Sequence, residues 1–323
     1  MTKTTRQPTA TEPRRDAYEA LLRRCKPLEP VATAVVYPCE ATALTGAVEA
    51  AEAGLITPIL VGPQKKIREV AREAGLNIDP YPIEDVPDSR AAAAKAVELV
   101  RAARAEMLMK GSLHTDELLA AVVASATGLR TGRRISHAFV MSVPTYPKPL
   151  IITDAAINIA PELDDKRDIC QNAIDLAHSL GKATPKVAIL AAVETVTTKM
   201  PATIDAAALC KMADRGQITG ALLDGPLGLD NAISPEAAKT KGISSPVAGD
   251  ADILLAPDLE AGNMLAKELT FLANADAAGI VLGARVPIIL TSRADGVRVR
   301  IASCAVAVLV AHARRTGQPG SEL

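Results

Sequence analysis

The stretch VATAVVYPCEATALTGAVEAAEAGLITPILVGP, residues 31–63, contains the pattern that decides the fold. It begins and ends with short apolar runs, VATAVVYP and PILVGP, and an alanine-rich segment of helical periodicity lies between them. Short apolar runs that stop at turn residues are typical of buried strands, and longer periodic segments are typical of helices. The stretch therefore predicts a strand, a helix and a second strand parallel to the first.

The same alternation continues along most of the chain. Strands that alternate with helices imply a mostly parallel sheet covered on both faces, which is the three-layer α/β/α class. Further strands are predicted at 106–111, at 186–193, after residue 218, after residue 251 and, as a central strand, within GIVLGARVPIIL (279–290). Helices are predicted at 16–25, 43–55, 65–75, 89–105, 115–129, 164–181, 203–216 and 301–315, and Thr115 is expected to cap its helix.

The pattern changes between about residues 130 and 150. Two apolar runs are separated there by Pro144, Pro147 and Pro149, which predicts two adjacent strands with a bend between them. The 323 residues of the chain exceed what one hydrophobic core usually serves, so two domains are expected. We place a crossing between the domains in this segment.

The composition excludes some classes of protein. Hydrophobic residues make up 49% of the chain, with no Trp and two Phe, so the cores are expected to be aliphatic. Aromatic platforms for stacking single-stranded nucleic acid are nearly absent. Thirty-six basic and thirty-seven acidic residues give a net charge of −1, without long blocks of like charge. No nucleic-acid partner is therefore expected.

The cysteines and the N-terminus predict a cytoplasmic protein. The five cysteines are scattered, and no pair has the spacing of a zinc site or a redox motif, which favours small buried residues in a reducing compartment. The N-terminal segment has no apolar core of a secretory signal, and no later segment has the about 18 uninterrupted apolar residues of a membrane span. The leader, residues 1–13, is expected to be disordered, and no membrane partner is expected.

Four predicted strand exits share one form, in which an apolar run is followed by Gly and then by polar residues. They are MKGSLHTDE (109–117), LDGPLGLDNA (223–232), APDLEAGNML (256–265) and LTSRADG (290–296). Glycine lets backbone amides approach an anionic ligand, and helix N-termini favour phosphate. Turn chemistry alone would also enrich Gly and Asp at such places. The pattern therefore leaves two interpretations open, a cleft for a phosphorylated ligand and ordinary α/β loops.

No single motif names a reaction. GPQKKI lacks the Lys-Ser/Thr ending of a phosphate-binding loop, and neither a dinucleotide-binding G-x-G-x-x-G nor a G-x-S-x-G elbow is present. The four histidines are too far apart in the sequence to suggest a metal motif, and His114 and His137 are the two that fall near the candidate loops.

Taken together, several stretches resemble the phosphate acetyltransferase and phosphate butyryltransferase family, over about residues 58–311. They are LMKGSLHTDELLAAVV, GRRISHAFVMSVPTYPKPLIITDAAINIAP, PKVAILAAVETV, DGPLGLDNAIS, GDADILLAPDLEAGNMLAKEL and LTSRADG. The block around ISHAFVMSVP and the PDLEAGN stretch are the most specific and are closer to the butyryltransferase branch.

The resemblance implies a fold, an assembly and an activity. It implies a two-domain, isocitrate-dehydrogenase-like α/β protein with the active site in a cleft between the domains. The first domain would comprise residues 1–136 and 273–323, and the second residues 137–272. The implied enzyme is a homodimer that transfers a short acyl group, acetyl or butyryl, reversibly between coenzyme A and inorganic phosphate. Acyl-CoA, phosphate and acyl phosphate are then substrates, with no metal and no permanently bound cofactor.

The resemblance also implies the catalytic residues Ser292, Arg293 and Asp295. Asp295 would take the proton from the coenzyme A thiol, and the resulting thiolate would attack the acyl phosphate directly in a ternary complex. Ser292 would donate a hydrogen bond to the developing oxyanion or to the sulfur. Arg293 would hold phosphate through paired hydrogen bonds. Asp295 lies nearer to the Ser-Arg pair than the catalytic aspartate of the acetyltransferases does, so its role is provisional.

The remaining predicted site residues come from the other loops. Arginine is typical of the family on the helix after the KG loop, but Leu119 occupies that place here, and Arg133 and Arg134 are assigned to coenzyme A binding instead. Two alternatives stay open, a non-catalytic acyl-CoA-binding protein and a metal-dependent dehydrogenase of the same fold. The predicted substrate-binding residues are Lys110, Gly111, Thr115, Asp224, Asp230, Asn231, Asp258, Gly262 and Asn263.

Overall fold

A computed structural model describes residues 17–292 and 295–317 of the chain. The predicted leader, residues 1–13, and the predicted catalytic Arg293 lie outside the described residues. Ser292 and Asp295, on either side of the second gap, are described.

Within the described residues, eleven strands form one continuous sheet in the order β3-β2-β1-β4-β11-β10-β5-β6-β9-β7-β8. The strands are β1 (Val31–Val36), β2 (Ile56–Gly62), β3 (Ile83–Asp85), β4 (Met107–Lys110), β5 (Ser136–Ser142), β6 (Leu150–Thr153), β7 (Lys186–Leu190), β8 (Leu222–Leu227), β9 (Ile253–Leu255), β10 (Asp276–Leu282) and β11 (Ile288–Ile289).

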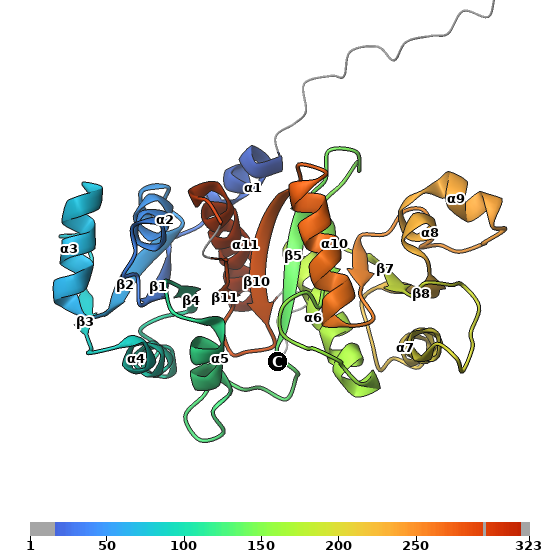
Figure 1. The fold of residues 1–323 in the computed structure, drawn as a ribbon, viewed down its shortest axis with the longest axis horizontal. Helices are drawn as coiled ribbons and strands as arrows, with labels where there is room; N and C mark the ends of the chain where they lie inside the picture. Colours follow the sequence, from blue (N-terminus) through green and yellow to red (C-terminus); the bar gives the residue numbers. More distant parts are fainter. Residues whose placement is uncertain (1–16, 293–294, 318–323) are drawn as a thin grey trace, which may run out of the picture.

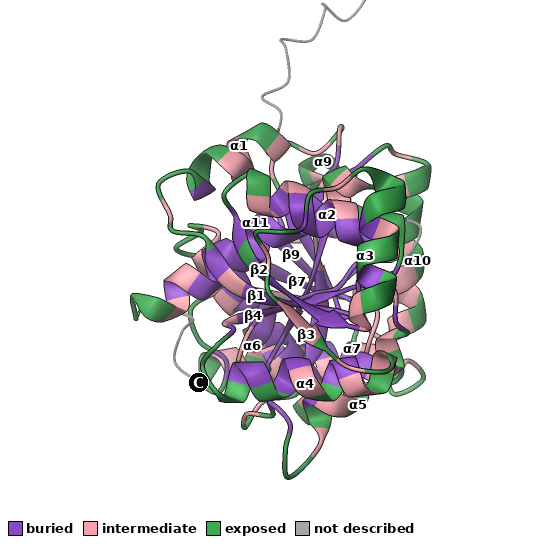
Figure 2. Ribbon diagram, turned by 90° about the vertical axis from the view of Figure 1, so that its left-hand side faces the viewer, coloured by how far each residue is buried: buried purple, intermediate pink, exposed green. Residues whose placement is uncertain are grey.

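Helices cover both faces of this sheet, so the predicted three-layer α/β/α class is confirmed (Figure 1). One face packs against α1, α2, α3, α6, α7 and α11, and the other against α4, α5, α8 and α10. Figure 2 shows the strands as a buried layer between helices whose outward sides are exposed. The helices are α1 (Ala17–Cys25), α2 (Ala41–Glu52), α3 (Gln64–Ala74), α4 (Ser89–Arg101), α5 (Thr115–Val123), α6 (Leu163–Ser179), α7 (Pro201–Asp214), α8 (Leu229–Ile233), α9 (Pro235–Thr240), α10 (Leu259–Phe271) and α11 (Val297–Arg315).

The sheet is parallel in its two outer parts and antiparallel in the middle. The strands from β3 to β11 run parallel to one another, as do those from β6 to β8. The pairs β11·β10, β10·β5 and β5·β6 are antiparallel. The two parallel parts therefore run in opposite directions.

The register brings the ends of these opposed strands to one row across the sheet. Ile289 pairs with Ile280, Ile280 with Ala138, and Ala138 with Thr153. The row continues to Met109 of β4 on one side and to Leu255 of β9 on the other. The strands β4 and β11 therefore end at the same row as β6 and β9, which run in the opposite direction. Four strand exits meet over the middle of the long β10·β5 pair.

Two predicted segments differ from the structure. GIVLGARVPIIL does not form one strand, because the turn after β10 reverses the chain and β11 pairs antiparallel to β10. The segment after residue 222 keeps its strand through Asp224 and Gly225 as β8 and then forms the short helix α8, where a glycine-rich loop was predicted. In both places the tertiary pairing outweighs the local turn signal of glycine.

The bend predicted between residues 130 and 150 is the antiparallel pair β5·β6, with the three prolines in its connection. The division into residues 1–136 with 273–323 and residues 137–272 stays a prediction. Its boundary falls between β10 and β5, which pair along their whole length.

Candidate functional site

The exits of β4 and β11 form the first half of the candidate site. These strands are neighbours and parallel, so the chain leaves the sheet side by side at Lys110 and at Thr291. The Lys110 side chain is buried. The Ser292 amide donates to Oδ2 of Asp295 at 2.6 Å, and the Asp295 amide donates to the Ser292 carbonyl oxygen at 3.2 Å. Two of the three predicted catalytic residues therefore form one compact turn.

Gly111 and Thr115 in the same exit have local structural roles. The Gly111 amide donates to the Val36 carbonyl oxygen at 2.9 Å, and a Cβ at Gly111 would lie 2.4 Å from that oxygen. Glycine is therefore required for β4 to approach the end of β1. The cap expected at Thr115 is wrong, because α5 begins at Thr115 and His114 occupies the N-cap position without a side-chain cap bond.

The exit of β6 forms the second half of the site around Asp154. This buried carboxylate accepts hydrogen bonds at Oδ1 from the amides of Ala156 and Ile157, at 2.9 and 3.0 Å. Its Oδ2 accepts from the side-chain amide of Asn158 at 2.5 Å and from the backbone amide of His137 at 3.2 Å. The carboxylate thus organises the turn and ties it to β5. Neither Asp154 nor Asn158 was singled out in the sequence, although both lie in the stretch GRRISHAFVMSVPTYPKPLIITDAAINIAP that resembles the family.

The exit of β9 packs onto this turn. Asp258 caps α10 by accepting from the Ala261 amide at 2.9 Å. Asn263 donates to the Ala155 carbonyl oxygen at 2.8 Å, and a Cβ on Gly262 would lie 2.2 Å from the Asp154 carbonyl oxygen. The predicted substrate-binding residues of PDLEAGN therefore lie at the Asp154 turn, where they hold the first turn of α10 against it.

His137 lies between the two halves. An ideal Cβ on Gly279 would be 2.6 Å from the Leu290 carbonyl oxygen and 3.2 Å from His137 Nε2, so both groups converge on this glycine. The ring packs edge-on against Phe139, with centroids 4.5 Å apart. The Leu290 carbonyl oxygen beside the ring favours the protonated form of His137. Burial lowers the pKa of His137 to about 4, and the charge of Asp154 opposes that shift. His137 is therefore neutral near pH 7.

The two predicted coenzyme A arginines diverge. The Arg134 guanidinium donates from Nε to Oδ1 of Asn158 at 2.8 Å, which places it beside the Asp154 turn. The Arg133 guanidinium instead forms an ion pair with Asp175 on α6, across the end of β5. Of the two, Arg134 is the one that adjoins the candidate site.

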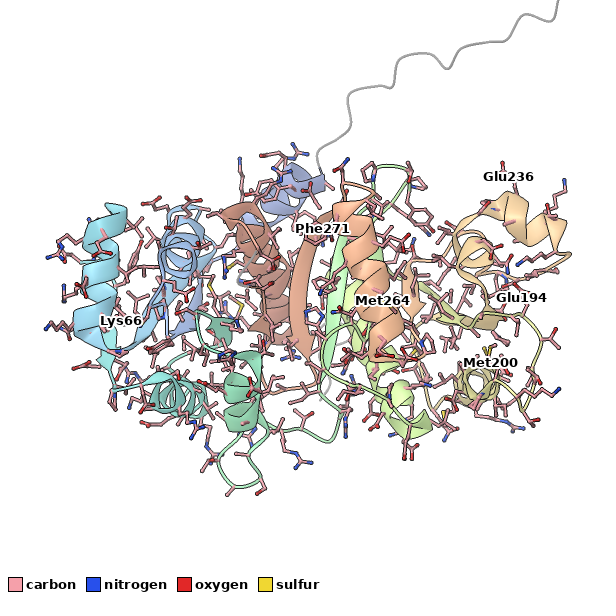
Figure 3. All side chains as sticks on the ribbon, in the orientation of Figure 1. Lys66, Glu194, Met200, Glu236, Met264 and Phe271 are labelled. Atoms are coloured by element: carbon pink, nitrogen blue, oxygen red, sulfur yellow. The ribbon has the colours of Figure 1, made fainter. Side chains whose placement is uncertain are left out.

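The predicted residues in LDGPLGLDNA lie elsewhere. They belong to β8 and α8, at the edge of the sheet, and Oδ1 of Asp224 accepts from the Gly225 amide at 2.8 Å. Asn231 donates to Glu194, and Lys241 contacts Glu194 at 2.7 Å and Asp230 at 3.1 Å. The Lys241 ammonium lowers the pKa of both carboxyl groups. Figure 3 shows Glu194 near the far end of the molecule. The structure does not bring this cluster to the Ser292 turn.

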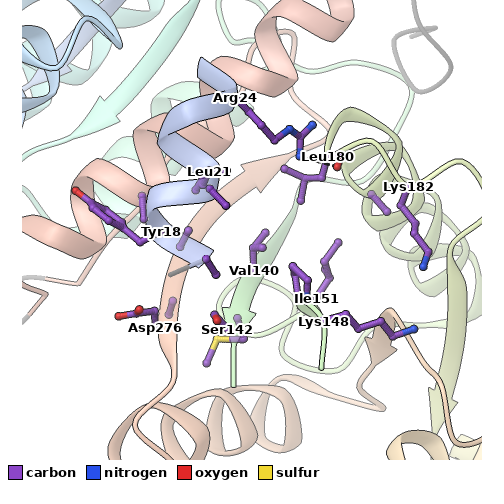
Figure 4. A pocket seen from close by; sticks show the side chains of 18 of the residues that line it. Tyr18, Leu21, Arg24, Val140, Ser142, Lys148, Ile151, Leu180, Lys182 and Asp276 are labelled. Carbon is purple, nitrogen blue, oxygen red and sulfur yellow. Dashed lines mark hydrogen bonds between the residues drawn. The ribbon is translucent and has the colours of Figure 1, made fainter. Parts of the chain in front are cut away.

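A cavity of about 460 Å³ opens on the face of the sheet that packs against α1 and α11 (Figure 4). Leu21 of α1, Val299 of α11 and the side chains of Val140 and Ile151 line it. None of the predicted site residues within the described ranges lines this cavity.

The described part of the chain, residues 17–292 and 295–317, has neither a candidate metal site nor a candidate membrane span. In it, no group of three or more His, Cys, Asp or Glu side chains is arranged to hold a metal ion. No described helix is both long and apolar enough to cross a membrane. The five cysteines, all described, are free, and four of them are buried.

Comparison with known proteins identifies the class that this fold and site define. The solved branched-chain phosphotransacylase from Enterococcus faecalis V583 superimposes with a TM-score of 0.77 at 30% identity, covering 87% of this chain and 99% of that one. The fold is therefore that of the phosphotransacylases, a class of acyltransferases, and the isocitrate-dehydrogenase-like architecture expected from the resemblance is confirmed.

The sequence comparisons narrow the class to a family. Residues 87–308 match the family described as "Phosphate acetyl/butaryl transferase". The phosphate acetyltransferase of Rhizobium meliloti is 66% identical over 301 residues, 93% of this chain and 95% of that protein. The phosphate butyryltransferase of Clostridium beijerinckii is 43% identical over 294 residues, 91% of this chain and 97% of that protein. The chain belongs to the phosphate acetyl/butyryl transferase family.

Proposed function

We propose that this protein is a phosphotransacylase that transfers a short acyl group reversibly between coenzyme A and inorganic phosphate. The observation that carries the proposal is membership of the family, together with the Ser292–Asp295 turn at a row where four strand exits meet. Both an acetyltransferase and a butyryltransferase are among its relatives, so a short acyl chain is the substrate class.

In the proposed reaction, the groups that act on the substrates come from the exit of β11 and from its neighbour, the exit of β4. The Asp295 carboxylate accepts the proton of the coenzyme A thiol, and the thiolate attacks the carbonyl carbon of acyl phosphate. The new C–S bond forms as the C–O bond to phosphate breaks, and phosphate leaves with that electron pair. Ser292 donates to the developing oxyanion, and Arg293 holds the phosphate oxygens. Lys110, buried beside this exit, adds positive charge for the anionic substrate.

The proposal also includes the substrates, a cytoplasmic location and a homodimer. Coenzyme A and its acyl esters are substrates, and neither a metal nor a permanently bound cofactor takes part. The buried free cysteines support a cytoplasmic setting. A homodimer is supported by the exposed apolar side chains of Met264, Phe271 and Leu272, on and directly after α10 (Figure 3). Sedimentation of the wild type against Phe271→Ser tests the dimer.

The first experiment is phosphate-dependent release of free thiol from acetyl-, propionyl- and butyryl-CoA. Ser292→Ala and Arg293→Ala are each expected to lower kcat/KM at least about tenfold, a loss of about 1.4 kcal/mol of transition-state stabilisation. The matched controls are Ser125→Ala and Arg68→Ala, which change an exposed serine and an arginine that pairs with Asp79 at 3.6 Å. Both controls are expected to retain wild-type rates.

One outcome would favour the non-catalytic alternative. Leu119, where the family places an arginine, packs half-buried against the core under α4 and α5. If folded protein binds coenzyme A without turnover of any of the three substrates, the protein is an acyl-CoA-binding member of the family.

A further inference from the structure

Arg300 is a buried arginine for which the proposed reaction has no use. It lies in the first turn of α11 and is 2% exposed. Arginine is rarely buried to this extent unless its guanidinium has a partner of its own. Burial lowers the pKa of Arg300, and the charge of Asp295 opposes the shift. The cost of burying this cation calls for an explanation.

Both hydrogen bonds of the guanidinium go to the exit of β11. Nη1 donates to the Thr291 hydroxyl at 2.8 Å, and Nη2 donates to the Ser292 carbonyl oxygen at 3.0 Å. The planar fork of arginine can span two acceptors on consecutive residues, whereas the ammonium of lysine has no such fixed geometry. Arg300 therefore clamps the last two residues before position 293.

Arg300 and Asp295 both bind the backbone of Ser292. The Ser292 amide is already bound by the Asp295 carboxylate, and the Ser292 carbonyl accepts from both Asp295 and Arg300. Both backbone polar groups of Ser292 are thus engaged by groups outside the strand ladder. A backbone held in this way limits the directions that the Ser292 side chain can take.

A glycine in another helix makes room for the clamp. Gly46 lies in α2, and a Cβ added there would be 2.7 Å from Cδ of Arg300 and 3.3 Å from its Cβ. Alanine is otherwise about 1 kcal/mol better than glycine inside a helix. The absence of a side chain at Gly46 is therefore matched to the stem of Arg300.

We propose that Arg300, seated against Gly46, is a positioning residue that fixes the exit of β11 so that Ser292 faces the substrate. The role rests on the proposed phosphotransacylase function. Arg300 itself does not contact substrate in this proposal, because it acts through the Thr291 hydroxyl and the Ser292 carbonyl. The same helix supplies a comparison residue, Arg314, which donates to the backbone carbonyls of Ala284 and Arg285, away from this exit.

The test compares Arg300→Met with Arg314→Met in the full-length protein. Arg300→Met is expected to lower kcat at least about tenfold at saturating acyl-CoA, with the KM for acyl-CoA changed less than about threefold. Arg300→Lys, which keeps the charge without the fork, is expected to restore only part of kcat. Arg314→Met removes a half-buried cation of the same helix and is expected to leave kcat unchanged, even where it lowers the melting temperature.

Two double variants show whether Arg300 acts through this exit. In the Ser292→Ala background, Arg300→Met is expected to add much less than its effect in the wild type, because both changes affect one unit. Gly46→Ala is expected to lower kcat in the wild type, where it presses on the Arg300 stem, and to have no such effect in Arg300→Met. Additive losses in both cycles would overturn the proposal.

Hydrogen exchange separates failure of this inference from failure of the proposed function. Peptides covering residues 288–299 are expected to exchange faster in Arg300→Met than in the wild type or in Arg314→Met. This readout does not depend on turnover. Unchanged exchange, or a folded Arg300→Met with wild-type kcat, rejects the positioning role. Faster exchange in a protein without any phosphotransacylase activity rejects the function and leaves the clamp in place.

Discussion

The exit of β11 and the exit of β8 have the same form in the sequence, and the structure uses them differently. Each is an apolar run followed by polar residues with Gly and Asp. The exit of β11 lies between β4 and β10 in the middle of the sheet, where buried side chains from β5 and α11 surround it. The exit of β8 lies at the edge, where Glu194, Asp230, Asn231 and Lys241 form a cluster of their own. Local composition marks a strand exit but does not reveal its neighbours.

Strand order accounts for this difference. Six steps across the sheet separate β11 from β8. At about 4.8 Å for each step, the two exits are on the order of 30 Å apart. We therefore expect that a group bound at Ser292 does not contact Asp230. Substitutions at the inner exits and at the exit of β8 test whether only the inner exits form the site.

The largest effect on stability is expected from Gly262→Ala at the inner exits. The added Cβ would lie 2.2 Å from the Asp154 carbonyl oxygen, so the backbone of the turn or of α10 must move. Overpacking of this kind costs about 3 kcal/mol, the upper part of its usual range, because backbone cannot yield as a side chain can. Urea unfolding measures the loss. Gly132→Ala is the control, since a Cβ there meets nothing within 4 Å. Equal stabilities of the two variants would contradict the close packing at Asp154.

A smaller, pH-dependent effect is expected at His137. Its pKa of about 4 in the folded protein lies below the ordinary value of 6.5, so the unfolded chain binds a proton more readily between these values. Stability is therefore fully present above about pH 6.5 and falls as the pH is lowered towards 4, with about 2 kcal/mol lost by pH 5.

Replacement of the ring tests this expectation. His137→Phe cannot titrate, so the difference between its free energies of unfolding at pH 7.5 and pH 5 is expected to be about 2 kcal/mol smaller than in the wild type. Urea titrations at both pH values measure this difference. The contributions of carboxyl groups that both proteins share cancel when the wild type and the variant are compared. An unchanged pH dependence would show that His137 is solvated or charged in the folded protein.

The smallest effect is expected at the outer exit. Asp230→Asn and Asn231→Ala leave the Ser292 turn untouched, so kcat/KM is expected to change by less than about twofold, or about 0.4 kcal/mol. The sequence assigns both residues to substrate binding, so this measurement decides between the two expectations. A tenfold rise in the KM for either substrate would place the outer cluster in the site and end the distinction between the exits.

Much of the fold followed from short-range pattern. The alternation in residues 31–63 predicted β1, α2 and β2, because periodicities of 3.6 and 2 residues depend only on neighbouring side chains. The segment of residues 279–290 was harder, because Gly283 and Pro287 are compatible both with an interrupted strand and with a reversal into β11. Antiparallel pairing between β10 and β11 decides between them.

The candidate site was predicted less completely than the fold. Ser292 and Asp295 contact each other and were predicted because the short stretch LTSRADG, which contains both, resembles the family. Arg300 and Gly46 were not found, since their contact joins residues that are far apart along the chain and belong to ordinary helical patterns. His137 was noticed only as a histidine near candidate loops, and its burial depends on β10 and β11 packed beside it.

The sequence by itself determined the strands and helices, the glycines and polar residues at the strand exits, and membership of the family, because each of these depends on local pattern or on similarity. The tertiary structure alone decided which exits meet. The two opposed parallel parts of the sheet end on one row through Ile289, Ile280, Ala138 and Thr153, a register that hydrogen bonding between distant segments sets. That register, together with burial of Arg300 behind it, turns one of four similar loops into the candidate centre of the site.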